Sequence, residues 1–250
     1  MKIVRTIADA SSLVTRDGTV GLVPTMGGFH EGHLSLFRTA RTENEVVVVS
    51  LFVNPAQFAP GEDLDRYPRN EERDAELAEA EGVDVLYVPP AEEIYPDGFQ
   101  TWIEVEELGS MLEGEHRPGH FRGVATVCLK LFNLVRPQRA YFGQKDAQQA
   151  AVIRRMVRDL AVPVEIRVCP TIRDEDGLAL SSRNSYLTPK EREAALALPR
   201  ALASHDRSLL NGLPVDYFEE ADFEPRVLVA AVRVGKTRLI DNVVLEGQTQ

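Results

Sequence analysis

The sequence contains no long apolar run. No stretch approaches the roughly 18 consecutive apolar residues that a membrane-spanning helix needs. The segment that begins with MKIVR also lacks the apolar region and the small-residue cleavage site of a secretory signal. We therefore expect a cytoplasmic protein with no membrane partner.

Cysteine and positive charge are also scarce. The only cysteines among the 250 residues, Cys128 and Cys169, have apolar neighbours and no CxxC spacing. Neither a disulfide framework nor a zinc site is predicted, and we expect both cysteines to be buried and to pack as small hydrophobic residues. With 28 basic and 39 acidic residues the net charge is −11. This excludes a general nucleic-acid-binding surface but allows one small nucleotide in a locally basic pocket.

Two common nucleotide-binding motifs are absent, since the sequence has neither a Walker A loop nor GxGxxG. What it has instead is alternation of apolar runs with segments of helical spacing. The run at 46–53 is continuously apolar, which is typical of a parallel strand covered on both faces. Strands are expected at 19–24, 46–53, 83–88, 140–142 and 164–168, with helices at 32–41, 70–81, 123–135 and 146–160. This order predicts an α/β fold, a doubly wound Rossmann-like parallel sheet.

The last third of the chain has a different pattern. A helix is predicted at 188–202, because Thr188, Pro189 and Glu191 form an N-cap, a first helical position and a capping box. Two strand-like runs, 226–234 and 237–245, flank Gly235-Lys236, a predicted hairpin turn. We therefore expect a large domain at 1–171 and a second, smaller α+β domain at 172–250 that acts as a lid.

The most informative motif is MGGFHEGH at 26–33, directly after the first expected strand. Glycines there let the backbone approach a ligand closely, and the start of the following helix attracts phosphate. His30 and His33 could donate to phosphate oxygens. They could equally cap the helix or pack against the sheet, whereas a metal site is weakly indicated because no third ligand is near.

Three further polar segments follow expected strands. In NPAQF at 54–58, Gln57 could bind a small polar substrate or belong to a simple turn. GQKDAQQ at 143–149 is either a turn with an N-cap or a site where Lys145 meets phosphate. The segment 173–184 joins two hydroxyls to two arginines, which suits a triphosphate as well as a solvated loop.

In order along the chain, PTMGGFHEGH, FVNPAQF, RPGHFRGVATV, FGQKDAQQ and GLALSSRNSYL resemble the pantothenate synthetases, or pantoate–β-alanine ligases. The five motifs occur in the family's order. The resemblance runs from about Leu22 to Leu187 and resumes near 214–217 and 237–242, so it covers nearly the whole chain. The resemblance implies an enzyme in which the pantoate carboxylate attacks the α-phosphate of ATP to give pantoyl adenylate and pyrophosphate. The amine of β-alanine then attacks the acyl carbon and releases AMP. Mg²⁺ and a homodimer are also implied.

The resemblance also implies roles for individual residues. Catalytic roles fall on His33, as the proton donor, and on His30, Lys145 and Arg183. Pantoate would contact Gln57 and Gln149, and β-alanine would contact Gln57. ATP would contact Met26, Gly27, Gly28, Phe29, His30, Glu31, Gly32, His33, Gly143, Gln144, Lys145, Asp146, Ile172, Leu180, Ser181, Ser182 and Arg183.

The chain departs from the family in three places. Gln144 stands where the family usually has glutamate, which predicts altered affinity rather than lost activity. The chain is shorter between Leu198 and Pro214 and at 223–226, so the lid is trimmed. Asp74 keeps some of the family's acidic character near the metal, although a charge run at a helix start explains it equally well.

Three rival functions fit the sequence less well. Another HxGH nucleotidyltransferase acting on a polyanionic acceptor should have extra basic residues, whereas this chain offers Asn54, Gln57 and Gln149. A class I aminoacyl-tRNA synthetase fits poorly with the acidic charge. A non-catalytic nucleotide-binding module would not be expected to keep every phosphate-contacting position.

Overall fold

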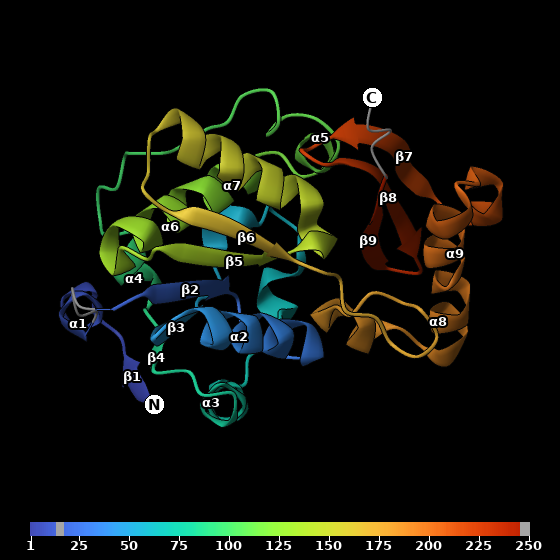
Figure 1. The fold of residues 1–250 in the computed structure, drawn as a ribbon. Coiled ribbons are helices and arrows are strands. Elements are labelled where there is room, and N and C mark those ends of the chain that lie inside the picture. Colours follow the sequence, from blue (N-terminus) through green and yellow to red (C-terminus); the bar gives the residue numbers. More distant parts are fainter. Residues whose placement is uncertain (14–17, 246–250) are drawn as a thin grey trace.

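A parallel six-stranded sheet forms the centre of the larger part of the molecule. In the computed structural model, which describes residues 1–13 and 18–245, the strands lie in the order β1-β4-β3-β2-β5-β6 (Figure 1). Every neighbouring pair is parallel. The strands are β1 (Lys2–Val4), β2 (Val20–Thr25), β3 (Val46–Leu51), β4 (Val85–Tyr87), β5 (Arg139–Gly143) and β6 (Glu165–Cys169).

Helices cover both faces of this sheet. Alternate residues of the buried strands enter different cores: Leu22 and Val48 join one apolar cluster, while Val23 and Val49 join the other. The first cluster is closed by α1 (Ile7–Leu13), α6 (His120–Val135) and α7 (Ala147–Asp159), the second by α2 (Glu31–Glu43) and α3 (Glu71–Ala80). The short helices are α4 (Ala91–Ile94), α5 (Glu113–His116), η1 (Pro55–Gln57), η2 (Asp63–Arg66) and η3 (Gln144–Asp146). The fold is therefore doubly wound and Rossmann-like, as predicted.

The strand order reverses between β2 and β5, which are hydrogen-bonded neighbours. In open α/β sheets, ligands bind beyond the carboxyl ends of the strands at such a switch point. The segment 26–33 follows β2, and the segment 143–146 ends β5 and leads into α7. The topology therefore brings two of the predicted phosphate-binding segments to the same place.

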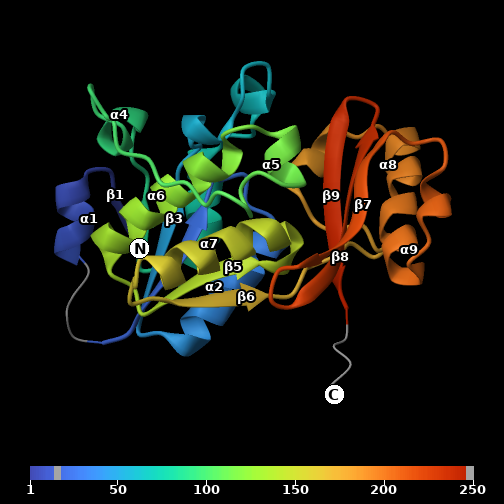
Figure 2. The same ribbon diagram turned by 90° about the horizontal axis from the view of Figure 1, so that it is seen from above.

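A second, antiparallel sheet follows in the chain. Its order is β7 (Val215–Asp222), β8 (Arg226–Val234) and β9 (Thr237–Val244). On one face it packs against α8 (Pro189–Ala195) and α9 (Ala197–Ser204), beside the turns η4 (Ser182–Tyr186) and η5 (Arg207–Leu210). Its other face packs with Ala147 and Ala151 of α7 (Figure 2). The smaller α+β part is thus present, while a domain boundary at 171/172 stays a prediction.

Most of the expected elements are confirmed, and one helix is corrected. The segment 188–202 is two helices separated at Leu196, because Pro199 has no N–H to donate to the carbonyl of Ala195. The capping box of Thr188 with Glu191 and the hairpin turn after β8 are both formed. Strands β1 and β7 and helix α1 were missed.

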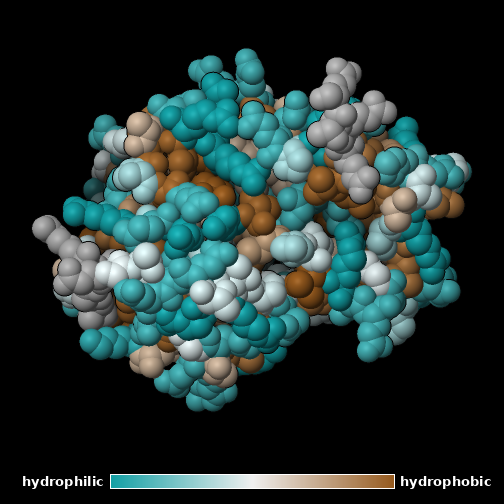
Figure 3. Space-filling view, in the orientation of Figure 1, coloured by the Kyte–Doolittle hydropathy of each residue, from teal (hydrophilic) through white to brown (hydrophobic). Residues whose placement is uncertain are grey.

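The remaining class predictions concern cysteine and the surface. Cys128 and Cys169 are both free and buried, as expected, and burial raises the pKa of the Cys128 thiol to about 12. In Figure 3, hydrophilic residues cover most of the visible face. Among residues 1–13 and 18–245, no helix is long and apolar enough to cross a membrane.

Candidate active site

A glycine loop leads from β2 into α2. Gly27 and Gly28 have φ angles of +85° and +66°, a region that side chains rarely adopt. The buried carboxylate of Asp74 accepts hydrogen bonds from the N–H groups of Gly28, at 2.7 Å, and Phe29, at 2.8 Å. A helix on one face of the sheet therefore holds the loop in shape.

This contact changes the interpretation of Asp74. Each of its carboxylate oxygens already serves a loop N–H group, so the side chain has a structural role that the sequence did not reveal. Across the described residues there is no group of three His, Cys, Asp or Glu side chains that could hold a metal ion. The metal role expected for Asp74 stays a prediction that none of its contacts supports.

His30 and His33 form a capping box at the start of α2. Nδ1 of His30 accepts from the N–H of Gly32 at 3.2 Å, and Nδ1 of His33 accepts from the N–H of His30 at 3.3 Å. In each neutral imidazole the hydrogen must then sit on Nε2. Helix capping and phosphate binding are therefore compatible, because each ring caps with one nitrogen and keeps the other as a donor.

The surroundings keep both rings neutral at pH 7. Burial is the main cause that lowers the pKa of His30 to about 4, and the positive charge of Lys145 is the second. Burial is also the main cause that lowers the pKa of His33 to about 3, and the neighbouring His30 is the second. Each ring thus offers one N–H donor and no charge in the free protein.

The turn after β5 carries a lysine and an aspartate. Nζ of Lys145 lies 3.4 Å from a carboxylate oxygen of Asp146. Burial opposes ionisation of Asp146, but the positive charges of Lys145 and Arg183, with the hydrogen bond from Lys145, together hold the pKa of this carboxyl below its usual value. Asp146 occupies the N-cap position of α7, yet its side chain makes no capping hydrogen bond. Both side chains remain in the site rather than closing the helix.

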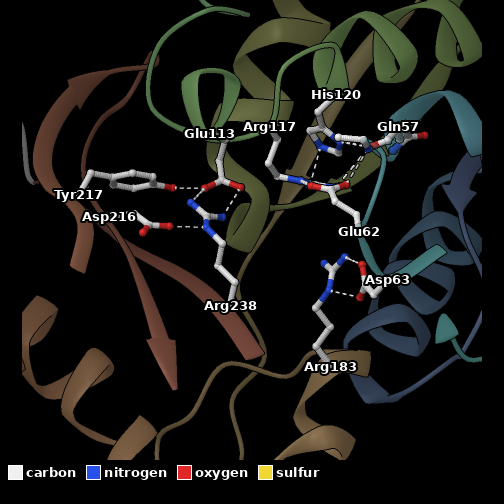
Figure 4. Close-up of polar contacts among 11 residues, drawn as sticks. Gln57, Glu62, Asp63, Glu113, Arg117, His120, Arg183, Asp216, Tyr217 and Arg238 are labelled. Atoms are coloured by element: carbon white, nitrogen blue, oxygen red, sulfur yellow. Dashed lines mark hydrogen bonds and ion pairs between the residues drawn. The ribbon is translucent and has the colours of Figure 1, made fainter. Parts of the chain in front are cut away.

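The serine–arginine segment lines the same cavity as this turn. Its Arg183 donates from Nε and a terminal nitrogen to the two oxygens of Asp63, at 2.8 and 2.9 Å (Figure 4). Ser181 caps η4 by accepting from the N–H of Arg183. Ser182 donates to the Tyr67 hydroxyl at 3.4 Å. In this state the carboxylate of Asp63 binds the guanidinium nitrogens of Arg183 that an anionic ligand would contact.

Asn54, in the segment that follows β3, orients the side chain of Gln57. Its Oε1 accepts from Nδ2 of the buried Asn54 at 2.8 Å, which leaves the Gln57 amide N–H groups as donors for a ligand. Nδ2 of Asn54 also donates to the carbonyl of Gly123 at 3.2 Å. A Cβ on Gly123 would lie 2.3 Å from the carbonyl oxygen of Ala56, so this close approach requires glycine. Asn54 therefore supports Gln57 rather than facing a substrate itself.

His120 and Arg117 also belong to the site, although the sequence alone does not indicate a role for either. Nδ1 of His120 donates to the carbonyl of Gln57 at 2.9 Å, and a terminal nitrogen of Arg117 donates to Nε2 of His120 at 3.1 Å. Arg117 also forms a two-point ion pair with Glu62 (Figure 4). Burial and Arg117 lower the pKa of His120 to about 4. Their motif, RPGHFRGVATV, was recognised, but only the fold shows that it meets Gln57.

A cavity of about 220 Å³ at the switch point collects most of the predicted residues. Of the predicted residues, it is lined by Met26, His30, Gly32, His33, Gln57, Gly143, Lys145, Asp146, Gln149, Ile172, Leu180, Ser181, Ser182 and Arg183. The other four residues of the first motif lie elsewhere. Phe29 is in the core, Gly27 and Gly28 shape the loop, and the exposed Glu31 pairs with Arg38. Gln144 turns toward β9.

An adjoining cavity of about 920 Å³ extends toward the small sheet and shares Lys145, Gln149 and Arg183. Glu113, Tyr217 and Arg238 line this cavity and belong to a network of paired side chains (Figure 4). Arg238 of β9 pairs with Glu113 of α5 and with Asp216 of β7, and the Tyr217 hydroxyl donates to Glu113 at 2.7 Å. The small sheet is therefore joined to the larger part by paired charges.

These features define a class. A doubly wound sheet with a helix N-terminus, two N–H-donating histidines and a lysine at its switch point is a nucleotide-binding protein of the Rossmann-like type. The family model of pantoate–β-alanine ligase matches residues 2–244. The chain belongs to the pantoate–β-alanine ligase family.

Individual relatives agree with this. The pantothenate synthetases of Acetivibrio thermocellus and Moorella thermoacetica are 48% and 51% identical; each alignment covers 98% of this chain, with 100% and 99% of the relative. The crystal structure of pantothenate synthetase from Thermus thermophilus has a TM-score of 0.93 at 47% identity, covering 98% of this chain and 99% of that chain. The ligase of Francisella tularensis, complexed with β-γ ATP and β-alanine, has a TM-score of 0.90 at 38% identity, covering 98% and 97%.

The alignments also bear on the expected shortening. Both curated relatives align over 280 positions, whereas this chain has 250 residues. At least 30 positions of each alignment therefore have no residue from this chain. The chain is shorter than these relatives, while the assignment of the missing residues to the lid stays a prediction.

Proposed function

We propose that this protein condenses pantoate with β-alanine to give pantothenate, using ATP and passing through pantoyl adenylate. Membership of the family supports the reaction. The observation that carries its assignment to this cavity is the arrangement at the switch point, where His30, His33 and Lys145 line one cavity with Gln57 and Gln149. Phosphate-binding and acid-binding groups thus lie within reach of each other.

In the first step a carboxylate oxygen of pantoate attacks the α-phosphorus of ATP. The new O–P bond forms while the bond to the β-phosphate oxygen breaks, and pyrophosphate leaves with the electron pair. The nucleophile is already anionic, so the main requirement is to neutralise charge at the α-phosphate. The Nε2–H groups of His30 and His33 and the N-terminus of α2 supply donors there.

Lys145, Ser181, Ser182 and Arg183 hold the rest of the triphosphate in this proposal. Lys145 and Arg183 both line the cavity and contribute its positive charge. Arg183 must exchange Asp63 for phosphate, since both of the oxygens that it binds in the free protein belong to that carboxylate. Met26, Ile172 and Leu180 are the proposed adenosine-side residues of the cavity.

Pantoate binds at the end of the cavity formed by Gln57 and Gln149. The amide N–H groups of Gln57 point to the ligand because Asn54 holds its oxygen. In the second step the amine of β-alanine, placed beside Gln57, attacks the acyl carbon of the adenylate. The C–N bond forms, the C–O bond to AMP breaks, and the amine loses a proton.

Mg²⁺ enters this proposal with ATP, as part of the bound substrate. Magnesium is commonly held by substrate phosphates and water with one or two carboxylates. The described residues contain no three-carboxylate cage, and Asp74 is engaged by the loop, so no step here depends on a metal held by the protein. A homodimer is also proposed, on the family resemblance alone, and the cytoplasmic location expected from the sequence remains part of the proposal.

The test is exchange of labelled pyrophosphate into ATP, with and without pantoate. We expect exchange that depends on pantoate and needs no β-alanine, because the first step is then reversible by itself. ATP binding without any exchange would refute the ligase and leave a nucleotide-binding module. Exchange that ignores pantoate would show that the acid substrate is a different one.

A further inference from the structure

Asn242 of β9 reaches from the small sheet to the turn that follows β5. Its Nδ2 donates to the carbonyl oxygens of Gln144 and Lys145, each at 2.9 Å. Its Oδ1 accepts from Nε2 of Gln144, also at 2.9 Å. The last contact requires an amide at residue 144, because a carboxylate has no hydrogen to donate. Only 4% of Asn242 is exposed, so these groups depend on one another rather than on water.

The turn has no side-chain cap of its own. Gly143, at the start of η3, and Asp146, at the start of α7, both make no side-chain capping hydrogen bond. The side-chain support on the carbonyls of this turn comes from a strand 98 residues further along the chain. The peptide groups on either side of the Lys145 Cα atom therefore take their side-chain support from Asn242.

The residue beside Asn242 binds the other phosphate-binding segment. The carboxylate of Asp241, only 2% exposed, accepts from two nitrogens of Arg173 at 2.6 and 3.0 Å. Arg173 pairs through a β-bridge with Ala179, just before the serines of that segment. Two consecutive residues of β9 thus hold the lysine turn and the serine–arginine segment together.

We propose that Asn242 is a positioning residue for ATP: it fixes the turn 144–145 so that Lys145 faces the triphosphate. This inference rests on the proposed function of the site. In it Asn242 acts on ATP only through the turn, and Lys145 makes the contact. The neighbouring Asp241 anchors Arg173, so two consecutive residues of one strand support both of the segments that would contact the triphosphate.

The test is the Michaelis constant for each substrate in Asn242→Ala. We expect KM for ATP to rise about tenfold, the scale of leaving buried carbonyls without donors. The KM values for pantoate and β-alanine should stay within about twofold. The matched control is Tyr217→Phe, which removes a different hydrogen bond between the small sheet and the larger part, at 2.7 Å from Glu113. An equal rise in the control would mean that seating of the sheet in general, and not Asn242, is responsible.

A double-substitution cycle tests whether Asn242 acts through Lys145. In Lys145→Ala, adding Asn242→Ala should change KM for ATP by less than about twofold, since the group being positioned is gone. Full multiplication of the two single effects would overturn the proposal. Asn242→Asp keeps the acceptor and the size but loses the donor, so it should behave like Asn242→Ala.

Two further outcomes are decisive. If Asn242→Ala and Asn242→Asp both fail to fold, Asn242 is a folding residue and the proposal is wrong. If the wild-type protein shows no pyrophosphate exchange, the proposed function fails. Equilibrium dialysis of ATP, compared between wild type and Asn242→Ala, then still tests the inference: a tenfold weaker binding supports it and equal binding refutes it.

Discussion

The two sheets contribute to the candidate site by different kinds of contact. At the end of β2, the hydrogen bonds that set the imidazoles of His30 and His33 span two and three residues of sequence. The contacts of the small sheet span much greater separations, 125 residues from Arg238 to Glu113 and 98 from Asn242 to Gln144. The imidazoles are therefore oriented by contacts that are local in sequence, although Asp74 holds the preceding glycine loop from 46 residues away. The contacts of the small sheet form only when the whole chain has folded.

This difference separates two tasks. The local region presents N–H donors and a helix N-terminus, which is what the chemistry at the α-phosphate needs. The distant region holds loops against each other through buried ion pairs and amides. We therefore expect substitutions in the first region to change mainly the rate of adenylation, with only the small loss of stability that follows the loss of a helix cap. Substitutions in the second region should change stability or substrate affinity first.

The largest expected effect is on stability, in Arg238→Met. It leaves the carboxylate of Glu113 buried without its main partner, which should lower the free energy of unfolding by about 3 kcal/mol. Chemical denaturation measures this. The control is Arg158→Met, whose exposed pair with Glu224 should leave the free energy unchanged within error. Equal values for the two variants would show that the buried network does not stabilise the small sheet.

The next effect is on rate, in His33→Ala. Losing one preorganised donor should slow the first step at least about a hundredfold, measured by single-turnover formation of pyrophosphate. Its melting temperature should stay much closer to that of the wild type than that of Arg238→Met does. Near wild-type turnover would remove His33 from the mechanism and would also remove the contrast between the two regions.

Acid should destabilise the protein through its buried histidines. The pKa of His120 is about 4 in the folded chain against 6.5 ordinarily, so the unfolded chain takes up the proton first. The stabilisation is complete above pH 6.5 and is lost as the pH falls toward 4. Between pH 7.5 and pH 5, His120 should account for about 2 kcal/mol of the loss. The free energy of unfolding, measured at both pH values in wild type and His120→Gln, isolates the contribution of His120. An equal loss of stability in the two proteins would contradict the prediction.

The smallest expected effect is in Gln57→Ala. Its amide faces the acid end of the cavity, so KM for pantoate should rise about tenfold while the affinity for ATP holds. Steady-state kinetics with each substrate varied in turn measures both quantities. Equal weakening of the two would mean that the acid site has been misplaced.

The parts of the fold that were predictable follow the same division. Two features that are continuous in the sequence made these predictions possible. The apolar run of β3 predicted a parallel sheet, and the glycines and histidines after β2 predicted the location of the main cavity. Strand β1 was missed because it has only three residues and buries only Val4. Strand β7 was missed because its register shifts between Val215 and Tyr217, which obscures the alternation.

The site was predictable to the same extent. The segments with Lys145 and Arg183 could be placed near the histidines because parallel strands end at one edge. Three contacts could not be predicted from the sequence. They are the ion pair of Arg183 with Asp63, the hydrogen bonds from the glycine loop to Asp74, and those from Asn242 to the turn that carries Lys145. Each of these pairs residues brought together only by the packing of distant elements.

The most direct test of the central claim follows an oxygen atom. Pantoate labelled with ¹⁸O in its carboxylate is converted with ATP and β-alanine, and the AMP is analysed by mass spectrometry. If the carboxylate attacks the α-phosphorus, one labelled oxygen stays on AMP when the amine displaces it. We predict one ¹⁸O in AMP and none in pyrophosphate; unlabelled AMP would contradict the adenylate and the roles assigned to both histidines.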